Sequence, residues 1–171
     1  MKELNFQSDI LPLKDKLFRL ALRITLDRAE AEDIVQDTLL RVWQRRDEWS
    51  SISNPDSYST TICRNLALDR CQAARRSNMT LDGEQAPTLS DTAPPPDVAL
   101  QRQERIAIIR QLMDQLPEAQ RTIMELRDME GRSYQEIADI MNITEAQVKV
   151  YLHRARTRIR TEAEKIERYG L

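Results

Sequence analysis

Two consecutive helix-start signals near the C-terminus restrict the fold of this chain more than any other feature. Ser133 and Glu136, and then Thr144 and Gln147, match the capping box S/T-x-x-E/Q. In this motif the hydroxyl accepts a hydrogen bond from a free backbone N–H, and the acid or amide accepts one from the cap residue. Asn142 lies between the signals and tolerates the left-handed conformation in which helices end. The segment therefore predicts a helix, a tight turn and a second helix.

The second of these helices combines an apolar stripe with a basic face. Apolar residues recur at helical spacing on both helices, as Ile137, Ala138 and Met141 and then as Val148, Leu152, Ala155 and Ile159. The basic residues on the other side of the second helix are Lys149, His153, Arg154, Arg156 and Arg160. Such a helix suits the major groove of DNA, where phosphates attract charge and long side chains reach base edges. A solvated basic face is the alternative.

Composition and charge favour helices with separate charged patches. The chain of 171 residues has only three glycines and 5% aromatic residues, which argues against a sheet. The net charge is only −2, but Asp27–Asp37 holds five acids against one arginine. Residues 64–76 hold four arginines against one acid. The small net charge therefore hides an acidic and a basic patch.

The two cysteines give no sign of a disulfide or a metal site. Cys63 and Cys71 are eight residues apart in an expected helix, more than one turn from each other. No C-x-x-C or H-x-x-x-H pair occurs, so we interpret both thiols as structural and expect no metal or other cofactor. The N-terminal residues lack a signal-peptide pattern, and no apolar run is long enough to span a bilayer. We therefore expect a cytoplasmic protein.

A proline-rich acidic segment divides the chain. Residues 80–98 hold four of the seven prolines and four acids without Lys or Arg, the composition of a solvated linker. We predict an all-α chain of two small helical domains, residues 1–79 and 99–171, joined by this flexible linker. The second domain should have four helices, with Pro117 in the first turn of one helix and Gly131 ending it.

The first domain shows three helical patterns. Apolar stripes run through Leu13, Leu17, Leu20 and Ile24, and through Ile34, Val35, Leu39, Val42 and Trp43. Pro55 forces Asn54 away from helical geometry, so we expect the third, long helix to run from Tyr58 to about Arg76.

Three strings carry a family resemblance, namely DRAEAEDIVQDTLLRVW, YSTTICRNLALDRCQAARR and LPEAQRTIMELRDMEGRSYQEIADIMNITEAQVKVYLHRARTRIR. In this order and at these separations the chain resembles the extracytoplasmic-function sigma factors, the compact bacterial sigma subunits of RNA polymerase. The resemblance implies that the first domain binds core polymerase and melts the minus-ten element, while the second docks on the minus-thirty-five element. The implied partners are core RNA polymerase, promoter DNA and an anti-sigma factor, with no enzymatic activity and no small-molecule substrate.

The first string predicts a polymerase-binding face. Asp33, Gln36, Asp37 and Leu40 share one helical face, with Arg41 and Trp43 beside it. An acidic face with an apolar margin suits a basic partner helix, and the resemblance identifies this partner as the clamp helices of the largest polymerase subunit. A solvated acidic face is the alternative.

The second string and the loop before it are where the resemblance places minus-ten recognition. The candidates are Trp49, Ser51, Asn65, Asp69, Arg70, Arg75 and Arg76. Flipped-out bases require polar pocket groups and aromatic walls beside a cationic track. Trp49 could equally be a core residue, and Asn65 a surface amide. Thr60, Thr61 and Cys63 replace the aromatic and aliphatic residues usual in the family, and we expect them to weaken the helix locally.

In the third string the resemblance assigns minus-thirty-five recognition to the basic helix. Lys149, Val150, His153 and Arg154 would face bases or phosphates, with Ser133 and Arg156 as further DNA contacts. Arginine is the favoured base reader because it can fork onto guanine O6 and N7. A solvated surface histidine is the alternative for His153. Asn142 and Tyr151 depart from the usual family pattern and affect the expected sequence preference more than the fold.

Three other functions fit the sequence less well. A dimeric helix-turn-helix repressor or activator would leave the acidic helix without a role, and the chain lacks a dimerisation zipper. An enzyme is disfavoured by a single histidine and the lack of a glycine-rich phosphate loop. A protein-interaction adaptor would leave the basic helix unexplained.

Overall fold

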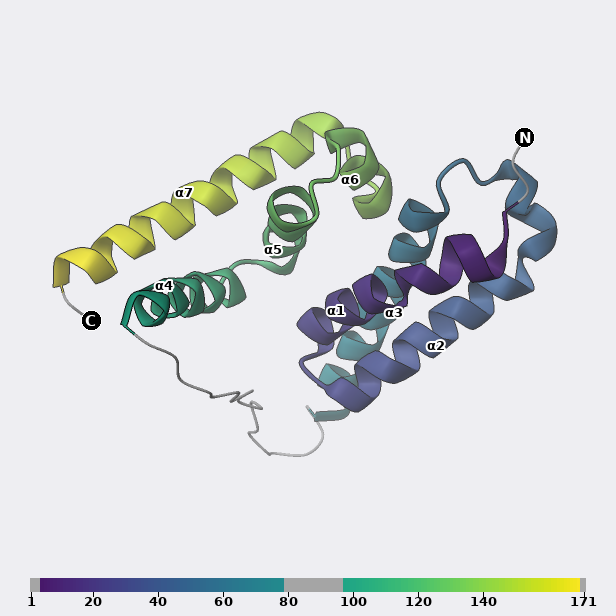
Figure 1. Cartoon of the computed structure of the whole chain (residues 1–171), viewed down its shortest axis with the longest axis horizontal. Coiled ribbons are helices and arrows are strands. Elements are labelled where there is room, and N and C mark those ends of the chain that lie inside the picture. The colour runs from purple at the N-terminus through teal and green to yellow at the C-terminus, as the bar shows by residue number, and fades with distance from the viewer. Residues whose placement is uncertain (1–3, 79–96, 170–171) are drawn as a thin grey trace. The chain divides into compact units, whose positions relative to one another are not determined.

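The structure is a computed structural model that describes residues 4–78 and 97–169, and these residues form helices without any β-strand (Figure 1). The predicted all-α class is therefore confirmed. The chain divides into two compact units, Met1–Leu89 and Ser90–Leu171. Most of the predicted linker lies outside the described residues, but its last two positions already belong to a helix that begins at Asp97. None of the described helices is long and apolar enough to cross a membrane.

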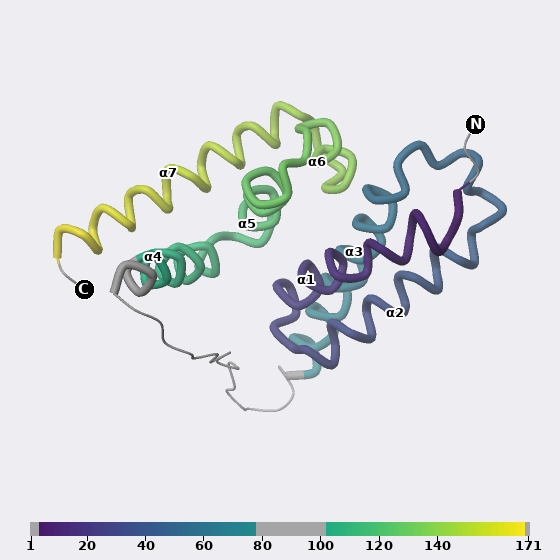
Figure 2. The backbone as a smooth tube through the Cα atoms, in the orientation of Figure 1, coloured from purple at the N-terminus to yellow at the C-terminus, as the bar shows by residue number. Residues whose placement is uncertain are grey.

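The N-terminal unit is built on three helices, α1 (Lys14–Thr25), α2 (Arg28–Gln44) and α3 (Pro55–Asn78), each packed against the other two (Figure 2). Short helices precede α1 (a π-helix, Phe6–Ile10, and a 3-10 helix, Leu11–Leu13) and link α2 to α3 (a 3-10 helix, Arg46–Ser51). The predicted stripes supply the core, with Leu17, Leu20, Ile24, Ile34, Val35 and Val42 buried. Trp43, the last residue of the second stripe, is instead 45% exposed.

Helix α3 begins three residues before the predicted start at Tyr58. The Asn54 side chain accepts a hydrogen bond from the Ser57 N–H at 3.1 Å, which caps the helix. Pro55 then takes the first helical position, where its missing N–H costs nothing and its backbone angle is already helical. The proline therefore starts the helix, whereas the sequence analysis treated it only as a break.

The expected weakening around Thr60, Thr61 and Cys63 does not interrupt α3. Thr61 Oγ1 donates a hydrogen bond to the Ser57 carbonyl at 2.8 Å, and Cys63 Sγ donates one to the Leu17 carbonyl of α1 at 3.4 Å. Thr60 and Cys63 are buried. Tertiary packing against α1 therefore compensates for the low helix propensity of these residues.

Burial makes Cys63 an unreactive thiol. It raises the pKa of Cys63 from 9.0 to about 12, so the thiol stays protonated in the folded protein near neutral pH. We expect iodoacetamide at about pH 8 to leave Cys63 unmodified in the native protein and to modify it in urea, as measured by mass spectrometry. Because the unfolded thiol loses its proton first, this group's contribution to the free energy of unfolding should fall as the pH rises above 9.0. Equal alkylation rates with and without urea would contradict the prediction.

The C-terminal unit contains the four predicted helices, α4 (Asp97–Asp114), α5 (Glu118–Met124), α6 (Tyr134–Met141) and α7 (Glu145–Tyr169). Helix α7 packs against the other three (Figure 2). The second predicted helix is divided, because α5 continues as a π-helix, Glu125–Met129. Pro117 is the residue before α5 and so lies one position outside the predicted first turn. Gly131, with φ +71°, ends this segment as predicted.

Candidate nucleic-acid and protein interfaces

The helix-turn-helix predicted near the C-terminus is formed by α6 and α7. Ser133 Oγ accepts from the Glu136 N–H at 3.2 Å, and a Glu136 carboxylate oxygen accepts from the Ser133 N–H at 2.9 Å. Thr144 and Gln147 make the same pair of bonds at 3.2 and 2.9 Å. Asn142 adopts φ 53° and ψ 49°, the left-handed conformation that ends α6. Local hydrogen bonds thus set where both helices begin, and the conformation of Asn142 sets where α6 ends.

Helix α7 presents most of its predicted DNA-facing side chains to solvent. Val148, Leu152 and Ala155 are buried, while Lys149, Val150, His153 and Arg154 on the other side are exposed. The Lys149 ammonium lies 5.4 Å from the Tyr134 ring centroid, and the Arg127 guanidinium lies 4.6 Å from it. Tyr134 therefore holds Lys149 near the start of α7 by a cation–π contact. Sequence patterns do not reveal this role of Tyr134, because a cation–π contact depends on tertiary packing.

Arg156 is engaged within the protein, although the sequence analysis assigned it to DNA. Its guanidinium makes a two-pronged ion pair with the carboxylate of Asp128, and the Nε bond measures 3.1 Å. The hydrogen bond to Asp128 raises the pKa of Arg156 above its usual value. Ser133 is exposed, but its hydroxyl is occupied by the capping box. DNA contacts by Arg156 and Ser133 remain predictions.

The predicted polymerase face of α2 is exposed. Asp33, Gln36, Leu40 and Trp43 all face solvent, and Leu40 has 53% of its surface exposed. Asp37 lies at the edge of this face and contacts the Arg70 guanidinium of α3. Arg70 also lies 2.8 Å from a Glu30 oxygen and 3.9 Å from an Asp33 oxygen.

These ion pairs connect the predicted polymerase face with the predicted DNA-binding residues of α3. The hydrogen bond to Glu30 is the main cause of the raised pKa of Arg70, and it keeps the guanidinium charged. Arg70 was predicted to contact DNA and Asp37 to contact polymerase, yet each partly neutralises the other. Because these groups are partly exposed, the pairs contribute only modestly to stability. Both intermolecular roles remain predictions.

An aromatic cluster forms at the junction of the N-terminal π-helix with the α2–α3 connection. The Phe6 and Trp49 rings stack with centroids 6.3 Å apart, and Trp43 packs edge-on against both, at 5.2 Å from Phe6 and 6.0 Å from Trp49. Trp49 Nε1 donates to the Val42 carbonyl at 3.0 Å. Half-buried Trp49 is thus a packing residue, and its role as a wall for a flipped base stays a prediction. Phe6 was not predicted, because nothing in the sequence links it to residues 43 and 49.

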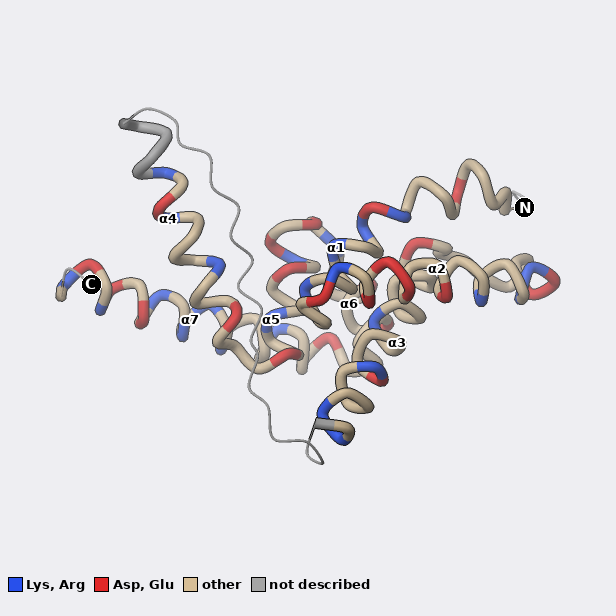
Figure 3. Tube along the Cα trace, turned by 90° about the horizontal axis from the view of Figure 1, so that it is seen from below, with Lys and Arg blue, Asp and Glu red and all other residues tan. Residues whose placement is uncertain are grey.

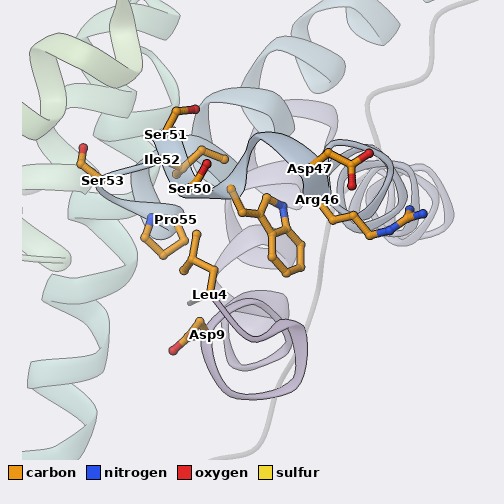
Figure 4. A pocket seen from close by; sticks show the side chains of 10 residues that line it. Leu4, Asp9, Arg46, Asp47, Ser50, Ser51, Ile52, Ser53 and Pro55 are labelled. Carbon is orange, nitrogen blue, oxygen red and sulfur yellow. The ribbon is translucent and has the colours of Figure 1, made fainter. Parts of the chain in front are cut away.

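Trp49 and Ser51 line a cavity of about 840 Å³ beside this cluster. Figure 4 shows Leu4 and Asp9 of the N-terminal segment on one side of it and Ser50, Ser51, Ile52 and Pro55 on the other. The lining mixes hydroxyl groups, a carboxylate of the N-terminal π-helix and an indole. Such a lining combines the apolar walls and polar groups that a flipped base requires.

The remaining predicted residues lie along α3. Asn65 and Asp69 are exposed, and Asn65 lines a second cavity together with Arg41 of α2. Arg75 and Arg76 occupy the last turn of α3, where Lys and Arg positions gather at the end of the helix (Figure 3). The structure therefore brings Asn65 and Arg41 together, although the sequence analysis placed them in different sites.

Comparison with known proteins identifies the family. The families Sigma-70 region 2 and Sigma-70, region 4 match residues 10–77 and 106–159. The extracytoplasmic-function RNA polymerase sigma factor SigL of Mycobacterium tuberculosis is 34% identical over 141 residues, covering 81% of this chain and 77% of SigL. The chain belongs to the extracytoplasmic-function sigma factors. As a sigma factor, it directs core RNA polymerase to promoters in transcription initiation.

Two further relatives agree with this assignment. The sigma factor SigW of Bacillus subtilis is 30% identical over 165 residues, covering 91% of this sigma factor and 87% of SigW. Among solved structures, the sigma factor RpoE from Bartonella quintana, in complex with the anti-sigma factor NepR, matches with a TM-score of 0.75 and 25% identity. The match covers 93% of this sigma factor and 96% of RpoE. The region 2 match includes the α2 face and the residues that line both cavities, except Leu4 and Asp9. The region 4 match includes the helix-turn-helix.

Proposed function

We propose that the two units of this sigma factor divide promoter recognition between them. The N-terminal unit binds core polymerase and the minus-ten element, and the C-terminal unit binds the minus-thirty-five element. The observation that carries this proposal is the exposed basic face of α7, whose orientation is set by two capping boxes and a buried apolar stripe. The α2 face has the opposite character, acidic with exposed Leu40 and Trp43, and so suits a different partner.

Core polymerase binds the α2 face in this proposal, through the clamp helices of its largest subunit. Exposed Leu40 and Trp43 provide the apolar contacts, and the acids beside them attract a basic helix. Asp37 contributes at the edge of this face while it stays paired with Arg70. The protein acts with polymerase and DNA in the cytoplasm, as a binding subunit and not as an enzyme.

The minus-ten element binds the α2–α3 connection and α3 in this proposal. The cavity lined by Trp49 and Ser51 accepts a flipped base, and exposed Asn65 and Asp69 face the duplex edge. Arg75 and Arg76 extend the cationic track along the end of α3.

The minus-thirty-five element binds α7, with Arg154 as the base reader. We expect Arg154→Ala to cost about 1–3 kcal/mol of discrimination between the cognate and a mismatched minus-thirty-five duplex, because a forked hydrogen bond to guanine is lost. Competition binding of the holoenzyme to both duplexes measures this difference. Arg158→Ala is the control, since Arg158 is also exposed on α7 but lies one turn further on. An equal loss of affinity for both duplexes with Arg154→Ala would assign Arg154 to the DNA backbone instead.

A direct test of the whole proposal starts with purified core RNA polymerase. The protein should bind core polymerase and direct transcription from a defined set of promoters in a promoter library. If the protein ignores core polymerase but shifts duplex DNA alone, it acts as a stand-alone helix-turn-helix regulator, and the α2 face has another partner.

A protein inhibitor is a further partner in this proposal. Support comes from the RpoE structure, which was solved in complex with an anti-sigma factor. An anti-sigma factor that covers the α2 face would compete with core polymerase, so adding it in excess should release core polymerase. A candidate inhibitor that leaves polymerase binding unchanged in excess is not this partner.

A further inference from the structure

We propose that the cleft between the end of α2 and the middle of α3 binds a phosphate of the promoter DNA backbone, held by Arg41 and Arg45. This inference rests on the proposed minus-ten role of the N-terminal unit. It also moves Arg41 from the polymerase face, where the sequence analysis placed it, to the DNA side of the molecule.

The chemistry of the cleft is that of an anion site. It has a volume of about 350 Å³ and is lined by Arg41, Gln44, Arg45, Ile62 and Asn65. These residues bring two guanidinium groups and two side-chain amides, and none of them is acidic. A guanidinium group can donate two parallel hydrogen bonds to a phosphate, and an amide N–H can donate another. The cleft therefore offers donors and positive charge to a single anionic group.

The positions of these residues follow from helical geometry. Arg41 and Gln44 stand at i and i+3 on α2, and Arg45, the residue that follows the last turn of α2, lines the cleft beside them. Ile62 and Asn65 stand at i and i+3 on α3 and face them across the cleft. Consecutive residues on a helix differ in direction by about 100°, so Arg41 is turned well away from its neighbour Leu40. Arg41 is thus on the flank that faces α3, away from the apolar centre of the polymerase face.

The two arginines differ in how they are held. Arg45 Nη1 donates to the Tyr58 hydroxyl of α3 at 3.4 Å, and this bond raises the pKa of Arg45 above its usual value. Arg45 is therefore anchored on the α3 side of the cleft. The Arg41 guanidinium makes no hydrogen bond or ion pair with residues 4–78 or 97–169, so its donors are available to a ligand. Arg45 is therefore held in position before DNA binds, whereas the Arg41 side chain can move to contact the phosphate.

Charge changes sign along the side of α2 that packs against α3. At the other end Glu30, Asp33 and Asp37 surround Arg70, which partly neutralises them. Arg45, Arg41, Asp37 and Asp33 follow one another at four-residue spacing along α2, so the column runs from basic to acidic. An anion is therefore directed to the Arg41 and Arg45 end.

The same charges indicate DNA and not polymerase as the source of the anion. The acids of the α2 face suit a basic polymerase helix, and such a helix would be repelled by Arg41 and Arg45. Asn65, which lines the cleft, is the residue proposed to face the minus-ten duplex edge. A phosphate beside Asn65 would fix the register of the DNA without specifying its sequence.

The test measures promoter binding by the holoenzyme as a function of salt. Replacing Arg41 and Arg45 together with Gln should weaken promoter affinity about tenfold and lower the slope of log K against log salt by about 0.7–0.9, because one phosphate contact is lost. Arg41→Gln and Arg45→Gln alone should each show part of this loss. Affinity for core polymerase should not change. Arg19→Gln is the matched control, because Arg19 is an exposed arginine of α1 without a hydrogen bond or ion pair among the described residues. A lower core affinity with an unchanged salt slope for Arg41→Gln would overturn the proposal.

Uncharged methylphosphonate linkages, which replace single phosphates, identify which DNA phosphate the cleft contacts. Methylphosphonates are introduced one at a time along the minus-ten DNA, and the wild-type holoenzyme should lose affinity at one or two positions. The variant with both Arg41 and Arg45 replaced by Gln should be insensitive at one of these positions and keep the wild-type pattern elsewhere. A variant that retains every wild-type sensitivity refutes the cleft as a phosphate site. If the wild-type protein itself fails to bind core polymerase or promoter DNA, the proposed function fails instead.

Discussion

Replacing Leu40 with Glu is expected to weaken the affinity of this sigma factor for core RNA polymerase about a hundredfold, equivalent to about 2–3 kcal/mol. Leu40 is 53% exposed and lies among the acids of the α2 face. In the proposed complex this side chain becomes buried against the clamp helices. A Glu at this position would lose the apolar contact and would bring an additional charge into a desolvated interface.

The fold should tolerate this substitution, because Leu40 contributes little to the core. We expect the free energy of unfolding to change by no more than about 0.5 kcal/mol. Leu11→Glu is the matched control, since Leu11 is 41% exposed and lies outside the α2 face. Titration of labelled core polymerase with each variant measures the effect. An equal loss of affinity for Leu11→Glu would show that charge, and not the position on α2, weakens the complex.

Leu152→Ala should lower the stability of the C-terminal unit by about 2–5 kcal/mol. Leu152 is 2% exposed and belongs to the core cluster that also contains Ile123, Leu126, Ile137 and Val148. Truncation leaves a cavity where α7 packs against α5 and α6, and the neighbouring side chains can fill it only in part. Loss of this packing removes the support of the recognition face, so binding to the minus-thirty-five duplex should fall as well.

The N-terminal unit should retain its stability in this variant, because its core cluster consists of its own residues, from Leu17 to Ala67. Hydrogen exchange of the full-length protein, read by mass spectrometry, should show faster exchange in α5, α6 and α7 and unchanged exchange in α1, α2 and α3. Val150→Ala is the control, since Val150 is 46% exposed on the same helix and should cost about 0.5 kcal/mol or less. Uniformly faster exchange in both units would mean that they unfold together.

Features that depend on neighbouring residues could be predicted from the sequence. The capping boxes at Ser133 and Thr144 each join residues three positions apart, and the left-handed turn at Asn142 depends on one residue. Apolar periodicity likewise predicted most of the buried side chains of α1, α2, α6 and α7, although Trp43 is exposed, because 3.6 residues per turn determine which side chains share a face. The all-α class, the helix-turn-helix and the family resemblance all follow from such short-range patterns.

Features that join distant segments required the folded chain. The Arg70 network connects residues 33 and 40 positions apart, and Phe6 meets Trp43 and Trp49 through three-dimensional packing. Periodicity shows which face of a helix is polar, but it does not show which helix that face meets or at what register. For that reason Arg41 could be assigned to the polymerase face from its sequence neighbours, whereas the packing of α2 on α3 places it beside Asn65. A local pattern determines a helix and its caps, but the pairing of charged groups depends on how the helices are aligned.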